Sequence, residues 1–221
     1  MRVEKTLLGQ SIRFIDDVRE AKKPSSLYEV TRAIQDRYRF LEAPTKLSDY
    51  NYQNGVTFQA GHFKSSIIGR FQIYQLGLLC EGSISTDVCD EFFDDITTFM
   101  EDEFGQRGKE KIEKRIYQSN LEVNSEINLG LAFKTLSGIG QKFFEILKSY
   151  GYDPTMYEMS SLKFNTDATQ IAGSSSPGEF IFERRAEKPY FANIYFSAAP
   201  LRTSDHIAIL QELEVALNKG A

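Results

Sequence analysis

The chain has no tryptophan and only two histidines and two cysteines among its 221 residues. The two cysteines, Cys80 and Cys89, cannot supply a disulfide framework or the four ligands of a structural zinc site, so we expect two reduced thiols. No apolar run approaches the ~20 residues that a membrane-spanning helix needs, and no basic-then-apolar signal-peptide pattern is present. We therefore expect a cytoplasmic protein with no membrane partner.

Sequence motifs that would indicate an enzyme are also missing. There is no Gly-x-Ser-x-Gly elbow, no P-loop ending in Lys-Ser/Thr, and no cluster of His and Cys with metal-ligand spacing. The sequence leans away from an enzyme without excluding one, because active sites also assemble from dispersed residues. We expect no cofactor and no metal.

The charge of the chain is acidic, with a formal net charge of −5 and a pI near 5.2. This balance weighs against a protein that coats nucleic acid, although it does not exclude nucleic acid. The 17 Phe and 11 Tyr residues supply an aromatic core. A chain of this length can bury roughly 70% of its unfolded surface, so it needs no covalent staple to fold.

One pattern occurs twice along the chain. A strand-like run with Ile73-Tyr74 leads to a Ser-Thr-Asp turn at residues 85–87, and Ile194-Tyr195 leads to Thr-Ser-Asp at residues 203–205. Short polar residues of this kind accept hydrogen bonds from the free N–H groups of a first helical turn. We therefore expect a helix to begin at each turn, and two similar halves.

The periodicity of apolar residues extends this pattern to the whole chain. It predicts an α+β fold of two pseudo-repeated β-α-β-β-β-α halves, with antiparallel sheets flanked by helices. The predicted halves are residues 1–105 and 115–221, joined by a polar linker at residues 106–114, and they can also form one compact domain. Residues 67–79 read as one long strand that bends or splits near Gly77. Whether the halves share one sheet or form two stays open.

The doubled order resembles, at the level of fold, the duplicated saddle architecture of TATA-binding proteins. No sequence motif places this chain in that family. The resemblance implies only an architecture, because one fold carries many functions.

The helix predicted over residues 86–104 carries eight acidic residues and no Lys or Arg. Its apolar residues, among them Phe92 and Ile96, share one face, which turns Asp90, Asp94 and Glu101 outward. Exposed carboxylates seldom act in catalysis, because they lack the burial that shifts their pKa values. We expect these three residues to form a solvated surface that faces a partner.

A ligand site is the alternative interpretation. It would use Arg184, Asp205 and His206, in a pocket between the halves. A second alternative is a nucleic-acid binder that uses the aromatic residues of a concave sheet. Buried charges facing a pocket would favour the ligand site, and a basic stripe across the sheet would favour the nucleic-acid binder.

The leading hypothesis is a non-catalytic structural or protein-interaction module of a bacterial or phage-like cytoplasmic system. Its partner would be another protein or a second copy of the chain. A large exposed apolar patch would favour this hypothesis over the two alternatives.

Overall fold

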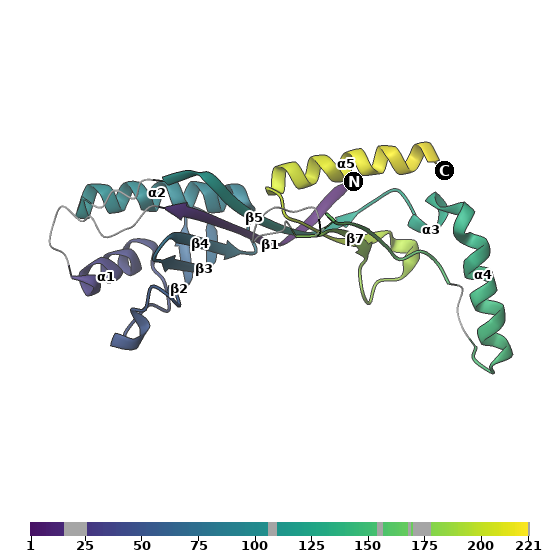
Figure 1. Cartoon of the computed structure of the whole chain (residues 1–221), viewed down its shortest axis with the longest axis horizontal. Coiled ribbons are helices and arrows are strands. Elements are labelled where there is room, and N and C mark those ends of the chain that lie inside the picture. Colours follow the sequence, from purple (N-terminus) through teal and green to yellow (C-terminus); the bar gives the residue numbers. More distant parts are fainter. Residues whose placement is uncertain (16–25, 106–109, 154–156, 168, 170–177, 221) are drawn as a thin grey trace. The chain divides into compact units, whose positions relative to one another are not determined.

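The computed structural model describes residues 1–15, 26–105, 110–153, 157–167, 169 and 178–220 (Figure 1). The chain combines helices with an antiparallel sheet, so the expected α+β class is confirmed. The strands are β1 (Arg2–Ile15), β2 (Val56–Phe63), β3 (Ser66–Tyr74), β4 (Gly77–Gly82), β5 (Glu110–Asn124), β6 (Ser161–Phe164), β7 (Phe180–Arg184) and β8 (Ile194–Ala199). The helices are α1 (Leu27–Tyr38), α2 (Thr86–Phe104), α3 (Leu129–Ala132), α4 (Lys134–Ser149) and α5 (Thr203–Gly220), with short 3₁₀ turns η1 (Leu47–Asp49) and η3 (Tyr190–Ala192).

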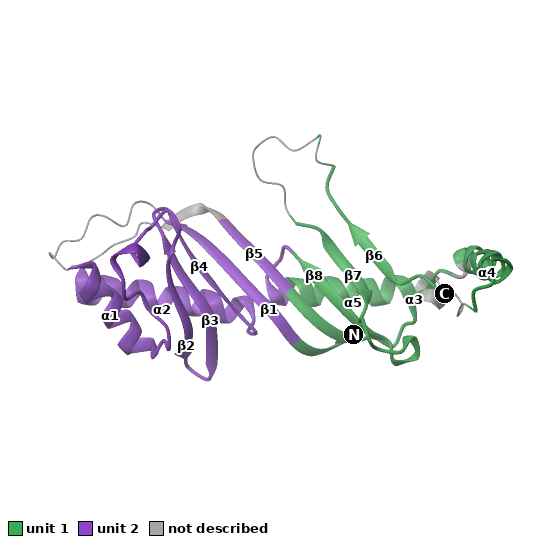
Figure 2. Cartoon of the chain, turned by 90° about the horizontal axis from the view of Figure 1, so that it is seen from below, with its two compact units in different colours: residues 1–5, 120–199, 205–221 green, residues 6–119, 200–204 purple. Residues whose placement is uncertain are grey.

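The eight strands are hydrogen-bonded in the order β2-β3-β4-β1-β5-β8-β7-β6. The chain divides into two compact units that both use parts of β1 and β5 (Figure 2). Unit 1 contains residues 1–5, 120–199 and 205–221, and unit 2 contains residues 6–119 and 200–204. This division differs from the expected halves of residues 1–105 and 115–221, because each long strand passes from one unit to the other.

Unit 2 is built around an aromatic core. Rings from α1, α2, β2 and β3 meet there, with the Tyr38 and Phe92 centroids 4.9 Å apart and those of Phe71 and Phe92 5.1 Å apart, both edge-to-face. Each such pair contributes about 0.5–1.5 kcal/mol beyond the burial of its area. Cys80 and Cys89 lie in this core as free thiols, and burial raises the pKa of Cys80. Both thiols are inaccessible, which fits a structural role for these cysteines.

Helix boundaries in unit 2 follow from their capping residues. Ser26 begins α1 in a capping box with Glu29, and the Ser85 hydroxyl begins α2 by accepting the N–H of Val88. Gly105 ends α2 in the left-handed conformation, where a residue without Cβ has no steric penalty. The bounds of α2 are those predicted from the sequence.

Unit 1 packs α5 against β5, β7 and β8. Phe182 and Tyr195 stack with centroids 4.5 Å apart, and Leu121 and Leu210 are also fully buried in this core. The Tyr195 hydroxyl donates to the Ile127 carbonyl at 3.0 Å and accepts the Leu129 N–H at 3.2 Å. The hydroxyl therefore anchors the chain that leads from β5 into α3.

The expected break near Gly77 is confirmed, whereas the expected linker differs in part. A two-residue turn at Gln75-Leu76 divides residues 67–79 into β3 and β4, which form a hairpin with Tyr74 opposite Gly77. Residues 110–114 of the expected linker belong to β5. Polar residues can also form a strand, because the backbone N–H and C=O groups of a strand pair with neighbouring strands whatever the side chains are. Residues 106–109 of that linker lie outside the described residues. No helix in the described ranges has the length and apolar character needed to cross a membrane.

Candidate functional site

Helix α4 in unit 1 exposes a continuous row of large apolar side chains. The row consists of Leu136, Ile139, Phe143 and Ile146, which are 42, 53, 53 and 49% exposed. Tyr150 extends the row at 70% exposure, directly after the last residue of the helix. Exposed apolar side chains scattered singly are ordinary, but a contiguous row marks an interaction site.

The spacing of this row defines a narrow seam. Its members recur at intervals of three, four and three residues, so at 100° per residue they fall within about 80° of one another. This is the pattern by which one helix packs along another helix or in a groove. We call Leu136, Ile139, Phe143 and Ile146 the α4 seam.

The chain itself covers one side of the seam. Gly140 is buried, and a Cβ added there would lie 2.1 Å from the Tyr157 carbonyl oxygen. The Tyr157 ring stacks on Phe143, with centroids 5.6 Å apart and an interplanar angle of 22°. Glycine at position 140 therefore permits the segment after α4 to lie directly against the helix backbone.

The charges of α4 lie outside the seam. Lys142 and Lys148 are exposed, and the Glu145 carboxylate accepts a hydrogen bond of 3.0 Å from the Gln141 amide. On the helical wheel Lys142 lies about 80° from the centre of the seam, whereas Lys148 lies about 160° from it. Lys142 therefore borders the apolar row, and Lys148 is on the opposite face.

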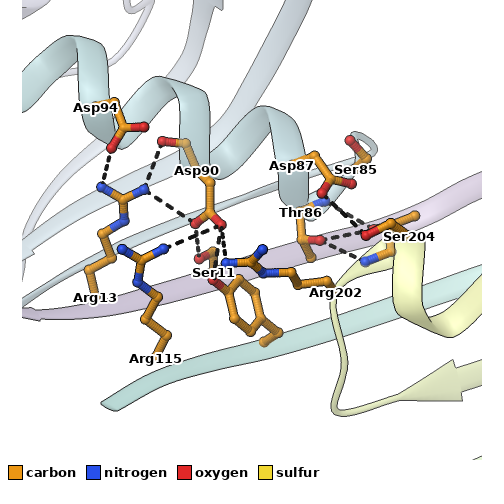
Figure 3. A network of polar contacts seen from close by, with 12 residues as sticks. Ser11, Arg13, Ser85, Thr86, Asp87, Asp90, Asp94, Arg115, Arg202 and Ser204 are labelled. Carbon is orange, nitrogen blue, oxygen red and sulfur yellow. Dashed lines mark hydrogen bonds and ion pairs between the residues drawn. The ribbon is translucent and has the colours of Figure 1, made fainter. Parts of the chain in front are cut away.

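In unit 2, a polar network is centred on Asp90 of α2 (Figure 3). The Ser11 hydroxyl donates to its Oδ1 at 3.1 Å, and the Tyr117 hydroxyl donates to its Oδ2 at 2.9 Å. Three arginine side chains also approach this carboxylate: Arg13 to 3.6 Å, Arg202 to 3.6 Å and Arg115 to 4.0 Å. The network links β1, β5, α2 and the segment before α5.

The buried arginine of the network is Arg13, whose side chain is only 5% exposed. Its Nη1 donates to Asp94 Oδ1 at 2.5 Å, and its Nη2 donates to the Asp90 carbonyl at 3.0 Å. Its guanidinium also lies over the Phe93 ring, 5.1 Å from the centroid. A buried guanidinium needs partners of this kind, so the network is best explained as support for the fold.

The expected acidic surface is therefore not uniform. The Asp94 side chain is 73% exposed, as predicted, and Glu101 is half-buried. Asp90 is only 15% exposed and faces the arginines instead of solvent. The helical periodicity placed Asp90 away from the apolar stripe correctly, but it could not show that β1 and β5 carry arginines beside that position. The partner-facing role of these three residues stays a prediction.

Figure 3 also shows where α2 and α5 begin. The Thr203 N–H donates to Thr86 Oγ1 at 2.7 Å, and the Thr86 N–H donates to Thr203 Oγ1 at 3.0 Å. Both threonines are buried. The Ser204 hydroxyl contacts Asp87 at 3.5 Å beside them.

In unit 1, Arg184 of the alternative ligand site has different neighbours from the other two residues of that site, Asp205 and His206. Arg184 is buried, and it donates to the Tyr190 carbonyl and to Asn128 Oδ1, both at 2.6 Å. It also lies 4.2 Å from the Tyr190 ring centroid and pairs with Glu158 at 3.5 Å. These contacts attach the loop between β7 and β8, and none of them involves Asp205 or His206.

His206 is fully buried in the first turn of α5, whereas Asp205 beside it is exposed. The His206 Nε2 atom lies 2.8 Å from Ser197 Oγ, and the Ser197 hydroxyl donates to the Ile181 carbonyl. Because the Ser197 hydroxyl proton already forms the bond to Ile181, His206 Nε2 is the donor in the hydrogen bond between His206 and Ser197. Burial lowers the pKa of His206 to about 4, so the ring is neutral at pH 7 and acts as a core residue.

A pocket of about 300 Å³ in unit 2 offers little reactive chemistry. Its acidic residues are Glu42 and Asp49. The backbone N–H groups of Lys46 and Thr45 donate to the Asp49 carboxylate and hold its pKa below the usual value. Asp49 therefore stays ionised and caps η1. The described residues include no group of His, Cys, Asp and Glu arranged to hold a metal ion.

Sequence reasoning missed the α4 seam as a functional feature. Leu136 and Phe143 belong to an apolar stripe with helical spacing, but periodicity alone does not reveal whether such a stripe packs on the core or faces a partner. The available signal was the apolar periodicity from Leu136 to Ile146. Searches against protein-family models and curated proteins find no match for this chain.

Proposed function

We propose that this protein is a non-catalytic protein-interaction module of a bacterial or phage-like cytoplasmic system, and that α4 is its docking helix. The exposed α4 seam is the single observation that carries this proposal. Four large apolar side chains in one row are costly to leave in water, at about 25 cal/mol per Å² of apolar surface. A partner that covers them removes this cost.

The two alternatives have less support in the described residues. Away from the two cores, arginines pair with glutamates: Arg70 of β3 with Glu81 of β4 at 2.7 Å, and Arg185, directly after β7, with Glu122 of β5 at 3.0 Å. Such pairs leave little positive potential for a nucleic-acid backbone. Arg184, Asp205 and His206 have separate surroundings, which weakens the ligand-site alternative.

We also propose that the fold is internally duplicated. The strand order β2-β3-β4-β1 of the first half has the same form as β6-β7-β8-β5 of the second, and α2 and α5 follow the corresponding strands β4 and β8. In an experimental structure, residues 1–105 should superpose on residues 115–221 with β1 on β5 and α2 on α5. A superposition that matches only one hairpin would contradict the duplication.

Site-specific crosslinking in the organism that encodes the protein tests the docking role. A photoreactive residue at position 139 lies in the seam, whereas one at position 141 lies on the opposite, polar face. We expect position 139 alone to crosslink one protein, and that protein, once purified, to bind the wild-type chain and not the Ile139→Ser/Ile146→Ser double variant. Equal binding by wild type and double variant would contradict the proposal. Leu47→Ser is the matched control, since Leu47 is 92% exposed but belongs to unit 2.

A further inference from the structure

Resting on the proposed docking role of α4, we infer the chemistry of the partner: a protein with an apolar groove that carries a carboxylate on the rim facing Lys142. The apolar seam indicates that the groove is apolar, and the positive charge of Lys142 beside the seam indicates that the rim of the groove is acidic.

The narrow width of the seam favours a partner with a groove over a partner with a flat surface. Gly140 and Tyr157 close one side of α4, so the apolar arc of about 80° that holds Ile139 and Ile146 is bounded on that side by the chain itself. Side chains spaced three and four residues apart enter successive pockets of a groove, as in other helix-in-groove complexes. The partner should therefore offer apolar pockets in a row.

The side of α4 that Tyr157 does not cover is positively charged. Lys142 is exposed on the side that Tyr157 does not cover, and Ser149 beside it is neutral. The Glu145 carboxylate lies about 140° from the centre of the seam and is engaged by Gln141. A carboxylate on the partner opposite Lys142 therefore finds a complementary charge and no competing one on α4.

The same geometry disfavours a second copy of the chain as the occupant. If two α4 helices packed antiparallel along their seams, Lys142 would face Lys142 of the other copy. If they packed parallel, Lys142 would face the half-buried Leu147. Neither arrangement supplies an opposite charge.

A membrane surface fits the helix less well than a groove does. Binding in the interface between water and lipid buries the whole apolar face of an amphipathic helix. Here the Tyr157 backbone lies against Gly140 on one side of that face, and lipid cannot hydrogen-bond a backbone group.

Charge reversal at two lysines of α4 tests the inference on the full-length chain and the purified crosslinked protein. Lys142→Glu should weaken the complex about tenfold at low salt and reduce the salt dependence of its Kd. Lys148→Glu, the same change on the opposite face, should alter the Kd by less than about twofold. Replacing the facing carboxylate of the partner with Lys should restore the binding of Lys142→Glu.

The outcomes separate this inference from the proposed function. Equal effects of Lys142→Glu and Lys148→Glu, together with loss of binding by Ile139→Ser/Ile146→Ser, would overturn the acidic rim and leave the docking role intact. Failure of position 139 to crosslink any protein would overturn both. So would seam-dependent binding to vesicles of 3:1 phosphatidylcholine and phosphatidylglycerol, or seam-dependent dimerisation of the chain in sedimentation velocity.

Discussion

Thr86 and Thr203 exchange hydrogen bonds at the first residues of α2 and α5. Each threonine hydroxyl accepts the backbone N–H of the other residue, at 2.7 and 3.0 Å, and the Thr86 hydroxyl donates to Thr203 Oγ1 at 3.2 Å. The N–H groups at the start of a helix have no partner within the helix. Two residues 117 positions apart thus satisfy each other's buried donors.

Replacing either threonine with valine keeps the shape but removes an acceptor from a buried N–H group. We expect Thr86→Val and Thr203→Val each to lower the free energy of unfolding by about 1–3 kcal/mol in chemical denaturation. The double variant should lose less than the sum, because the pair acts as one unit. Thr98→Val, an exposed position on α2, is the control and should change stability by no more than about 0.5 kcal/mol. Additive losses would show that the two residues are not coupled.

His206 should make stability fall in acid. Its pKa is about 4 in the folded chain and about 6.5 when unfolded, so between these values the unfolded chain binds the proton more tightly. The contribution of His206 to the free energy of unfolding is complete above pH 6.5. It falls by at most about 3 kcal/mol as the pH falls toward 4. Denaturation of wild type and His206→Gln at pH 7 and pH 4.5 measures this difference. His62→Gln, which changes an exposed histidine, should follow the wild-type pH dependence, and equal pH dependence in His206→Gln would refute the assignment.

Asp90 should matter more for stability than other carboxylates of α2. Asp90→Asn removes the less exposed of the two carboxylates that pair with the buried Arg13. We expect a loss of about 3 kcal/mol in urea denaturation. Asp102→Asn, an exposed position on the same helix, should stay within about 0.5 kcal/mol of wild type. If the two variants were equally stable, the Asp90 network would not support the fold.

The two glycines of α4 should respond to alanine in opposite directions. An added Cβ at Gly138 has nothing within 4 Å, so Gly138→Ala should stabilise the helix by up to about 1 kcal/mol. At Gly140 the Cβ would meet the Tyr157 carbonyl, so Gly140→Ala should displace Tyr157 from α4 and lose stability despite its better helix propensity. Thermal unfolding and the NMR contact between Tyr157 and Phe143 report both effects. Stabilisation by Gly140→Ala with that contact intact would contradict the packing described.

Local signals in the sequence predicted the local structure well. The Ser85-Thr86-Asp87 turn and the stripe of Phe92 and Ile96 were enough to predict the bounds of α2, because caps and periodicity act within a few residues. The strand order and the division of β1 and β5 between the units depend on pairings between distant segments, which periodicity does not encode.

The candidate site was harder to predict for a similar reason. Asp90 and Asp94 are equivalent by helical periodicity, yet Asp90 is only 15% exposed among arginines of β1 and β5, whereas Asp94 pairs with Arg13 and stays 73% exposed. The residues of α4 formed a recognisable stripe, but an apolar stripe that packs on the core and one that awaits a partner have the same pattern. Only the exposure of Ile139 and Phe143 in the folded chain distinguishes them.

Hydrogen exchange of the protein, free and in complex with its crosslinked partner, tests the docking role of α4 most directly. The backbone amides of residues 136–150 should exchange more slowly in the complex, because a covered helix opens less often. Amides of α2 around Asp94 and Glu101 serve as the internal comparison. Slowed exchange confined to α4 is the result we predict, whereas unchanged exchange in α4 with protection elsewhere would contradict the account.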